Sequence, residues 1–198
     1  ESYAKRKDLC REEASGAYRA KAGRTVTQLY YAKKRIITPE MEYVAIRENQ
    51  QVETLGLKSY ITPEFVRKEV AAGRAVIPAN VNHVELEPMI IGNRFLVKVN
   101  SPINYHRGTQ EPIVEIEEQL LNYLAMGCDT LTALIEQEER SVEETDCLRG
   151  VLLRRCPIPV GVNPLLAAAW GGELDWSLFR DRLIALCETG VDFVRLYP

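Results

Sequence analysis

The spacing of apolar positions changes near residue 76 and divides the chain into a helical part and a part of alternating elements. In the helical part, "ITPEMEYVAIREN" (37–49) and "ITPEFVRKEVAAG" (61–73) each predict a helix, because Thr, Pro and Glu follow one another at the start. Thr accepts a hydrogen bond from an unpaired backbone amide, Pro has no amide to lose there, and Glu faces the positive end of the helix dipole. Gly73 predicts the end of the second helix.

Beyond residue 76, apolar runs and amphipathic stretches take turns along the chain. The runs at 94–100, 129–135, 158–162 and 191–197 predict strands, and the stretches at 112–127, 141–156 and 175–190 predict helices. Short connections between strand and helix are typical of right-handed parallel crossovers. We therefore predict an α/β fold, a partial (βα)8 barrel of the TIM type with four parallel strands and crossover helices, preceded by an N-terminal helical and extended arm.

This pattern also predicts how the chain is divided. Residues 1–24 form an extended arm with some helix, residues 25–92 a helical region, and residues 93–198 the half barrel. A half barrel leaves two strand edges unpaired and one face uncovered. Three outcomes are open: helices cover both faces of an open sheet, another chain covers it, or the gene product continues. Because the last strand runs up to Pro198, we expect the chain to be incomplete by itself and other protein chains to cover the open edge.

Composition narrows the class of protein and of partner. The chain has 198 residues, 46% apolar and 27% charged, with a net charge of −3, which is typical of a globular protein with one ordinary core, or with one core and a small extension. Lys and Arg are scattered apart from a locally basic N-terminal stretch, so we expect a solvated face or docking arm there and no nucleic-acid partner. No apolar run is long enough to span a bilayer, and the start at Glu1 indicates a mature or trimmed N-terminus.

The cysteines argue against a metal centre within this chain. They are widely spaced and form no C-x-x-C cluster: Cys10, Cys128, Cys147, Cys156 and Cys187. We therefore predict no metal or iron–sulfur ligation and no cofactor held by this chain alone. Three of the cysteines lie within or beside apolar runs and are interpreted as buried thiols in a reducing compartment.

Two long blocks of sequence resemble a known family. "GRTVTQLYYAKKRIITPEMEYVAIREN" (23–49) and "ITPEFVRKEVAAGRAVIPANVNHVELEPMIIGNRFLVKVN" (61–100) resemble phosphomethylpyrimidine synthases, the ThiC family, and the similarity continues through "CPIPVGVNPL" and "DWSLFRDRLIALCETGVDF". It covers about residues 20–198. The words "ELEPMI" (85–90) resemble the plant and algal branch, which favours a plastid or mitochondrion.

What this resemblance implies is an atypical radical S-adenosylmethionine enzyme. Members rearrange aminoimidazole ribotide into hydroxymethylpyrimidine phosphate, with a [4Fe–4S] cluster in a C-terminal domain and zinc or iron on two histidines. Their fold is a central (βα)8 barrel between an N-terminal and a C-terminal domain. The resemblance therefore implies that this chain holds the N-terminal region and the first half of the barrel, without the part that carries the cofactors.

The family's substrate-binding positions are altered here. In the family pattern K-[VI]-N-A-N-I-G-N-S the second Asn binds substrate, and Pro102 takes its place in a loop that we expect to open with Ser101-Pro102. Thr132 stands in place of a Met, Leu166 in place of a Tyr and Tyr197 in place of a His. Proline has neither an amide side chain nor an N–H to offer. We predict that none of the four keeps the old contact and that the chain has no catalytic residue.

Other polar residues have ordinary interpretations beside functional ones. His83, which we place near the barrel mouth, is either a hydrogen-bonded structural histidine or a remaining ligand site. His106 is interpreted as an exposed loop residue. Glu85 and Glu87 would point to the same side of an extended segment, where paired carboxylates can do acid–base work, but no nucleophile or metal pattern accompanies them. Asp129, Asp192 and the stretch 170–172 are interpreted as turn and loop residues.

Three hypotheses of different classes follow. The first is a ThiC-like domain that is catalytically inactive and serves as a structural or interaction subunit of a larger, organellar assembly. The second is a fragment of an authentic synthase that converts aminoimidazole ribotide to hydroxymethylpyrimidine phosphate. The third is a module that binds another small molecule, and it ranks last because the four altered positions do not converge on a recognisable ligand.

Overall fold

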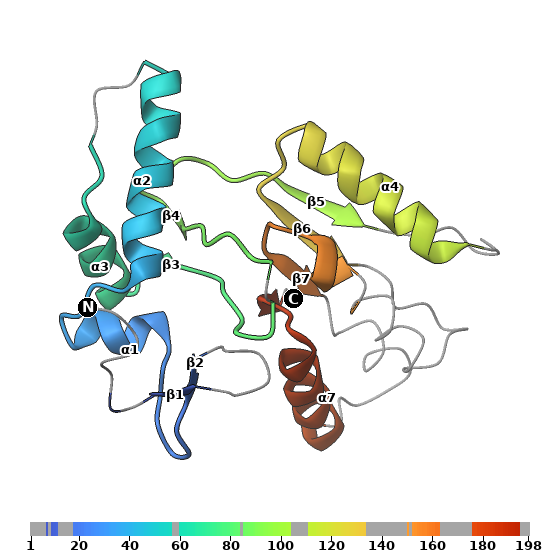
Figure 1. Ribbon diagram of the computed structural model, residues 1–198, viewed down its shortest axis with the longest axis horizontal. Coiled ribbons are helices and arrows are strands. Elements are labelled where there is room, and N and C mark those ends of the chain that lie inside the picture. Colours follow the sequence, from blue (N-terminus) through green and yellow to red (C-terminus); the bar gives the residue numbers. More distant parts are fainter. Residues whose placement is uncertain are drawn as a thin grey trace. The chain divides into compact units, whose positions relative to one another are not determined.

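The chain folds into two compact units, seen here in a computed structural model. The structure describes residues 7, 9–11, 18–56, 60–83, 85–103, 111–133, 150, 152–162 and 176–194. Unit 1 consists of residues 1–77 and 88–97, and unit 2 of residues 78–87 and 98–198 (Figure 1). The predicted three-part division into domains stays a prediction.

Unit 1 is mainly helical. Its elements are the antiparallel strands β1 (Leu9–Arg11) and β2 (Tyr18–Ala20), the helices α1 (Gln28–Lys33), α2 (Pro39–Thr54) and α3 (Pro63–Ala71), and the antiparallel pair β3 (Ala75–Val76) and β4 (Ile91–Gly92). Its core joins α2 and α3 to the segment around β4, through Met41, Val44, Val66, Val70 and Ile90. The N-terminal arm is therefore a hairpin in the described residues, where some helix was also predicted.

The helix starts in unit 1 follow the sequence signals. Thr62 Oγ1 accepts a hydrogen bond from the amide of Phe65 at 3.1 Å, and Thr38 Oγ1 accepts one from the amide of Met41 at 3.3 Å. Gly73 follows α3 with a φ of +71°, a left-handed conformation that suits glycine. These predictions are confirmed. Helix α1 was not predicted.

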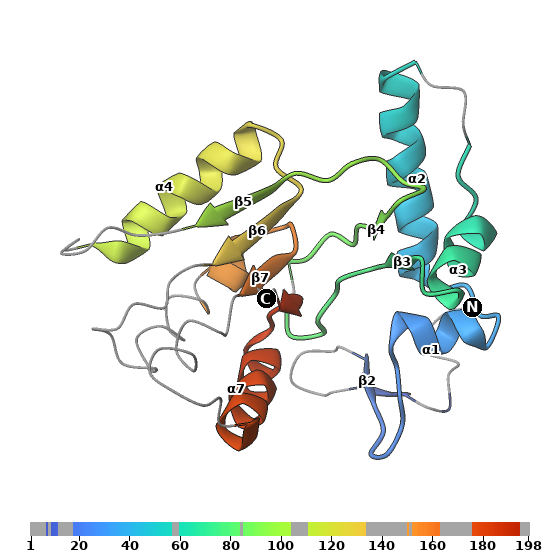
Figure 2. The same cartoon turned by 180° about the vertical axis from the view of Figure 1, so that it is seen from behind.

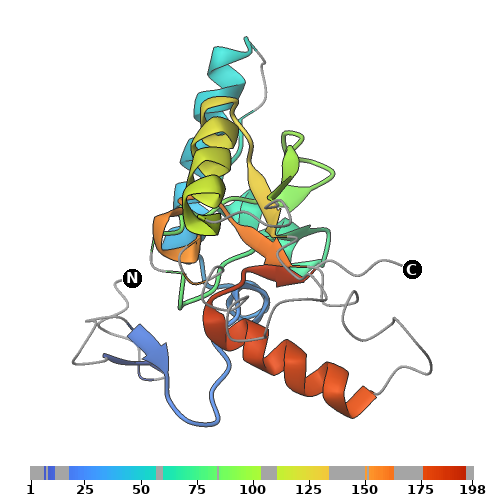
Figure 3. The same cartoon turned by 90° about the vertical axis from the view of Figure 1, so that its right-hand side faces the viewer.

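Unit 2 contains a four-stranded parallel sheet. Its elements are β5 (Asn100–Ile103), α4 (Pro112–Ala125), β6 (Thr130–Ala133), a helical piece at 152–155, β7 (Val160–Val162), α7 (Trp176–Thr189) and β8 (Phe193–Val194). The strands are ordered β5-β6-β7-β8, and every neighbouring pair is parallel (Figure 3). Helix α4 runs alongside β5 and β6 (Figure 2). The predicted fold class, a partial α/β barrel of four parallel strands with crossover helices, is confirmed.

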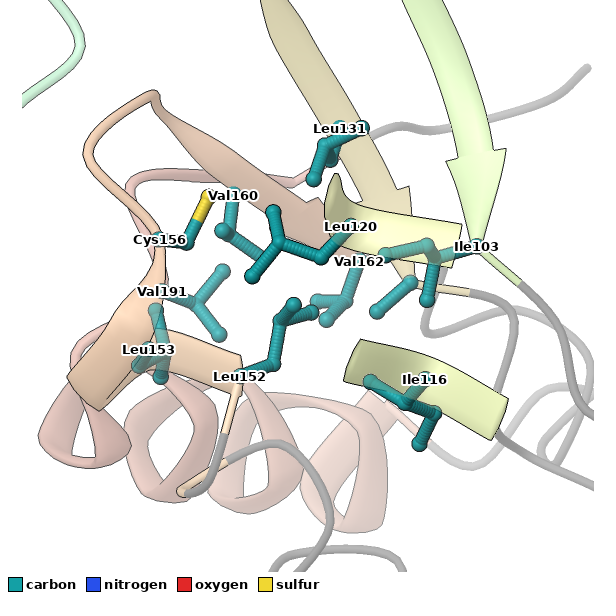
Figure 4. Packing of buried hydrophobic residues seen from close by; sticks show 11 residues of the cluster. Ile103, Ile116, Leu120, Leu131, Leu152, Leu153, Cys156, Val160, Val162 and Val191 are labelled. Atoms are coloured by element: carbon teal, nitrogen blue, oxygen red, sulfur yellow. The ribbon is translucent and has the colours of Figure 1, made fainter. Parts of the chain in front are cut away.

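One face of this sheet carries the core of unit 2. Ile103, Leu131 and Val162 point from the strands toward Ile116 and Leu120 of α4 (Figure 4). All five are at most 4% exposed. Fully burying an aliphatic side chain contributes about 1.5–3 kcal/mol. The burial of these five side chains therefore stabilises the packing of α4 against the sheet.

The first strand begins later than its apolar pattern predicts. A strand was expected over residues 94–100, but residues 96–99 are not in a strand and β5 begins at Asn100. The ring of Phe95 packs on Phe65 with 5.7 Å between centroids, and the amide of Leu96 donates to Glu48 Oε2 at 3.0 Å. These contacts within unit 1 override the local pattern. Ser101 and Pro102 therefore lie inside β5, and the prediction that they open a loop is wrong.

Two predictions that concern the whole chain meet different outcomes. None of the helices in the described ranges is long and apolar enough to cross a membrane. Of the four cysteines that the structure describes, Cys156 is buried, Cys128 is partly buried, and Cys10 and Cys187 are exposed. Cys187 follows an apolar run in sequence, yet the helix turns its side chain outward.

Candidate functional site

A single row of residues crosses all four strands on the face opposite the core. Pro102 is paired with Thr132, Thr132 with Gly161, and Gly161 with Phe193. Successive side chains of a strand alternate between the faces, and the neighbours Ile103, Leu131 and Val162 point into the core. The row therefore lines the inner face of the partial barrel, toward the carboxyl ends of the strands, where barrels of this kind carry their sites.

A small polar cluster lies one step earlier on the same face. Thr130 and Thr132 donate hydroxyl hydrogen bonds to Asn100 Oδ1 at 2.9 and 3.0 Å. Both threonines are buried, whereas Asn100 is exposed. The amide of Asn100 is thus held in place while its NH2 group can still donate to a ligand. Sequence reasoning passed over Asn100, although it keeps the first Asn of the family pattern K-[VI]-N.

The middle of the row is filled by an aromatic ring. A Cβ atom built on Gly161 would lie 2.0 Å from Cε2 of Phe193, so the ring sits directly against the glycine backbone. Only glycine leaves room for that approach. Phe193 therefore gives this part of the inner face an apolar surface.

Pro102 occupies a special place on the sheet edge. The amide of Thr130 donates to Val99 O at 3.1 Å, and the amide of Leu131 donates in the other direction, to Pro159 O at 2.9 Å. Alternate residues of a strand direct their backbone groups to opposite sides. The backbone groups of Pro102 therefore face away from β6. At this point β5, an edge strand among the described residues, has no N–H to donate.

Two of the four predicted site positions are brought together by the fold. Pro102 and Thr132 are direct neighbours across β5 and β6, whereas Leu166, Tyr197 and His106 lie outside the described residues. The described residues of this face can donate and accept hydrogen bonds through their amide and hydroxyl groups. None of them is a carboxylate, imidazole, amine or thiol that could move a proton near neutral pH.

His83 lies at the other end of the strands. Its Nδ1 is 2.6 Å from Asp192 Oδ2 and its Nε2 is 2.7 Å from the carbonyl oxygen of Cys156, and the side chains of His83 and Asp192 are fully buried. Cys156 precedes β7 and Asp192 precedes β8, so this cluster belongs to the amino ends of the strands. The predicted position near the barrel mouth is wrong, and the interpretation as a hydrogen-bonded structural histidine is confirmed.

Cysteine, histidine and aspartate meet here, but not as a nucleophile with its base. His83 contacts the backbone oxygen of Cys156, while the thiol donates to Ile158 O at 3.2 Å. Burial, with a smaller contribution from the charge of Asp192, raises the pKa of the Cys156 thiol to about 12. A catalytic thiol needs a lowered pKa and a base within reach, so this arrangement stabilises the fold.

The paired glutamates do not form a carboxylate site. Glu85 lies in a turn, and Glu87 donates its amide to Pro157 O at 2.8 Å in an irregular segment. Both side chains are exposed. Within the described ranges, no three His, Cys, Asp or Glu side chains come together in a group that could hold a metal ion.

Comparison with known protein families shows what this chain is similar to. A sequence model described as the radical SAM ThiC family matches residues 27–197. The match runs from the residue that precedes α1 to the segment after β8, and it therefore includes residues of both units.

Proposed function

We propose that this chain, which belongs to the radical SAM ThiC family, is a member without the family's catalytic activity that serves as a structural or interaction subunit of a larger assembly. The observation that carries the proposal is the row Pro102, Thr132, Gly161 and Phe193 on the inner face of the sheet. These residues present a proline ring, a hydroxyl group, glycine backbone and an aromatic ring. Proton transfer would need an ionisable side chain, and the row contains none.

The position of Pro102 supports this proposal. By the resemblance, an asparagine there binds the substrate, and its amide could both donate and accept. Pro102 lacks that side chain, and the one hydroxyl opposite it, on Thr132, already donates to Asn100. The polar groups of this face thus satisfy one another and leave less for a ligand.

The cofactor chemistry of the family finds no support in the described residues. The name of the family points to S-adenosylmethionine and an iron–sulfur cluster, which takes cysteine thiolates as ligands. The described cysteines are not grouped, and no set of three metal-binding side chains exists in the described ranges. The residues present do not fit such a cluster, and we derive no reaction step through it.

An interaction role fits the exposure of the sheet. Parallel sheets are usually covered on both faces, and here one face packs against α4 while Asn100 and Pro102 of β5 are exposed. We propose that other protein chains cover this part of the half barrel. A reducing organelle, a plastid or mitochondrion, is the proposed compartment, on the resemblance to the plant and algal branch.

Asn100 favours a second candidate. It keeps a residue of the family pattern and holds an exposed amide on the inner face. This is what a fragment of an authentic synthase would show, with the remaining half of the barrel supplied elsewhere. In that case aminoimidazole ribotide would be the substrate and hydroxymethylpyrimidine phosphate the product.

A direct assay separates the two candidates. The purified chain is incubated without oxygen with iron, sulfide, a reductant, S-adenosylmethionine and aminoimidazole ribotide, and hydroxymethylpyrimidine phosphate is measured by mass spectrometry. We expect none above the background of a reaction without the chain. Product formed by the chain alone, or after a polypeptide that completes the barrel is added, would favour the synthase.

The assembly role has its own test. Native extracts are separated by size, and the chain is followed with an antibody. We expect it in fractions far above its mass of 22.5 kDa, and the free monomer alone would contradict the proposal.

The double variant P102N/T132M restores the family residues, and a gain in affinity for aminoimidazole ribotide over the control T132S would identify these two positions as the site of the loss.

A further inference from the structure

Residues 78–87, which we call the strap, leave unit 1 and join unit 2. They lie in sequence between β3 and β4, which pair with each other in unit 1. In Figures 1 and 2 the strap is the green segment that runs beside the red C-terminal elements. Side chains of the strap make hydrogen bonds to residues more than 70 positions later in the chain, so they connect the strap to distant parts of unit 2.

The strap caps the C-terminal end of α7. The last carbonyl groups of a helix have no partner within the helix. Here Asn80 Nδ2 donates to Cys187 O at 2.7 Å and to Val191 O at 2.9 Å, and Asn82 Nδ2 donates to Glu188 O at 3.0 Å. The backbone amide of Asn82 donates to Asn80 Oδ1 at 2.9 Å, which fixes the orientation of the Asn80 side chain.

Asp192 joins the strap to two strands. Its Oδ1 accepts from the amide of Asn80 at 2.8 Å, and its Oδ2 accepts from the amide of Val160 at 2.9 Å and contacts His83 at 2.6 Å. Both ring nitrogens of His83 lie within hydrogen-bond distance of oxygen atoms, Asp192 Oδ2 and the carbonyl oxygen of Cys156, so His83 connects the strap to both. A buried carboxylate with these partners is costly to lose, because each partner would be left without a bond.

The close passage of the strap also fixes the turn after α7. Gly190 has a φ of +107°, and a Cβ atom on it would lie 3.2 Å from the carbonyl carbon of Asn82. A side chain would be strained there by both the backbone conformation and the contact. The strap, the end of α7 and the start of β8 are thus fitted to one another.

We propose that the strap is a structural part of the half-barrel unit, which folds stably only when Asp192 holds the strap against α7 and β7. The half barrel is then discontinuous in sequence, and its amino end is closed by a segment that precedes its first strand. The inference does not depend on the proposed function, because it concerns the end of the sheet away from the altered row.

The test uses the full chain and the variant D192N. Asparagine has nearly the same shape, but its NH2 group cannot accept the bonds that one carboxylate oxygen accepts now. The exposed Glu85 makes the strap a substrate for a protease that cleaves after glutamate, whereas the bond after Glu87 precedes Pro88 and resists such a protease. We expect cleavage after Glu85 to be at least tenfold faster in D192N, with cleavage after Glu53 in unit 1 unchanged.

A second readout reports on unit 2 alone. Both tryptophans, Trp170 and Trp176, fall within its residues, so tryptophan fluorescence follows its unfolding, and the far-ultraviolet dichroism of the helices follows both units. We expect the urea midpoint by fluorescence to fall in D192N. The control D181N makes the same change on an exposed residue of α7 that pairs with its neighbour Arg180, and we expect it to behave as wild type.

A milder variant keeps the proposal testable if D192N does not fold. N80A removes the side-chain bonds to Cys187 and Val191 and leaves Asp192 intact. We expect strap cleavage to be severalfold faster than in D181N. Strap cleavage and a fluorescence midpoint equal to those of D181N, in either D192N or N80A, would overturn the proposal.

Discussion

The two units satisfy their buried polar groups in different ways. In unit 1 many partners are close in sequence: Glu69 binds Arg74, and the amide group of Asn49 binds both backbone groups of Ile61. The longer bonds of this unit join Arg67 to Ala32 O and Leu96 to Glu48, over 35 and 48 positions. In unit 2 the partners are far apart, with 112 positions between Asn80 and Asp192 and 73 between His83 and Cys156. Unit 1 therefore depends more on contacts between neighbouring segments, and unit 2 more on contacts between distant ones.

This difference has a consequence for folding. Local contacts form at a small entropic cost, and distant ones require long loops to close first. We therefore expect a substitution in unit 2 to lower the stability of the whole unit, and a substitution in unit 1 to weaken mainly the contacts around the changed residue. The following substitutions test that contrast, from the largest expected effect to the smallest.

The strongest way to break unit 2 is to empty its core. Leu131 is fully buried between the sheet and α4, and Leu131→Ala should destabilise unit 2 by about 3 kcal/mol through lost burial and a residual cavity. Urea unfolding followed by tryptophan fluorescence measures the change. Leu121→Ala on the outer face of α4, where the side chain is 66% exposed, is the matched control and should cost less than about 0.5 kcal/mol.

Overfilling the inner face tests the packing of the row. Gly161→Ala forces a methyl group into the ring of Phe193, and overpacking of this kind costs about 2 kcal/mol. The same fluorescence measurement applies. Adding Phe193→Ala to Gly161→Ala should recover part of the loss, and two changes that simply add would mean that the contact is unimportant.

In unit 1, Asn49 connects α2 to the segment before α3. Its side chain donates to Ile61 O and accepts from the amide of Ile61, both at 2.8 Å. Asn49→Ala leaves two buried backbone groups without partners and should cost about 1–2 kcal/mol. We expect the helical dichroism to melt earlier while the fluorescence transition of unit 2 keeps its midpoint, and equal shifts in both signals would contradict the separation of the units.

Acid should weaken unit 1 through Glu69. This carboxylate is buried, and its hydrogen bonds to Arg74 lower its pKa from the ordinary value of 4.5. Its stabilising contribution is therefore present above that value and is lost as the pH falls through the lower pKa of the folded state. Glu69→Gln should be less stable than wild type by dichroism at pH 7, and the difference should shrink below pH 4.5. A constant difference would show that its charge is unimportant.

The smallest effect concerns thiol chemistry and leaves stability untouched. Burial raises the pKa of Cys156 to about 12, so almost no thiolate exists there near neutral pH. Iodoacetamide should label Cys10 and Cys187, which are exposed, and should spare Cys156 until the chain is unfolded. Mass spectrometry of the digested protein reads out each site, and rapid labelling of native Cys156 would contradict the burial.

The same contrast explains what the sequence could predict. The ends of α3 at Thr62 and Gly73 depend on neighbours three or four residues away, so the local sequence was sufficient to predict them. The strand predicted over 94–100 was misplaced because Phe95 and Leu96 pack in unit 1 with Phe65 and Glu48, which no local pattern encodes.

The candidate site shows the same division. The resemblance selected Pro102 and Thr132 by position, and the register of β5 and β6 makes them neighbours. Histidine chemistry alone could not place His83, since its partners lie 109 and 73 residues away. Asn100 was overlooked because its importance comes from two hydroxyl groups on the adjacent strand.

Pro102 has one more effect, on the behaviour of the protein in concentrated solution. An exposed sheet edge with a full set of backbone donors is a template on which other chains can stack into fibrils. At Pro102 this row of backbone donors is interrupted, because proline has no N–H group and its backbone faces away from β6. We therefore expect Pro102, which by the resemblance stands at a substrate-contact position, also to oppose the addition of further strands at this edge of the described sheet.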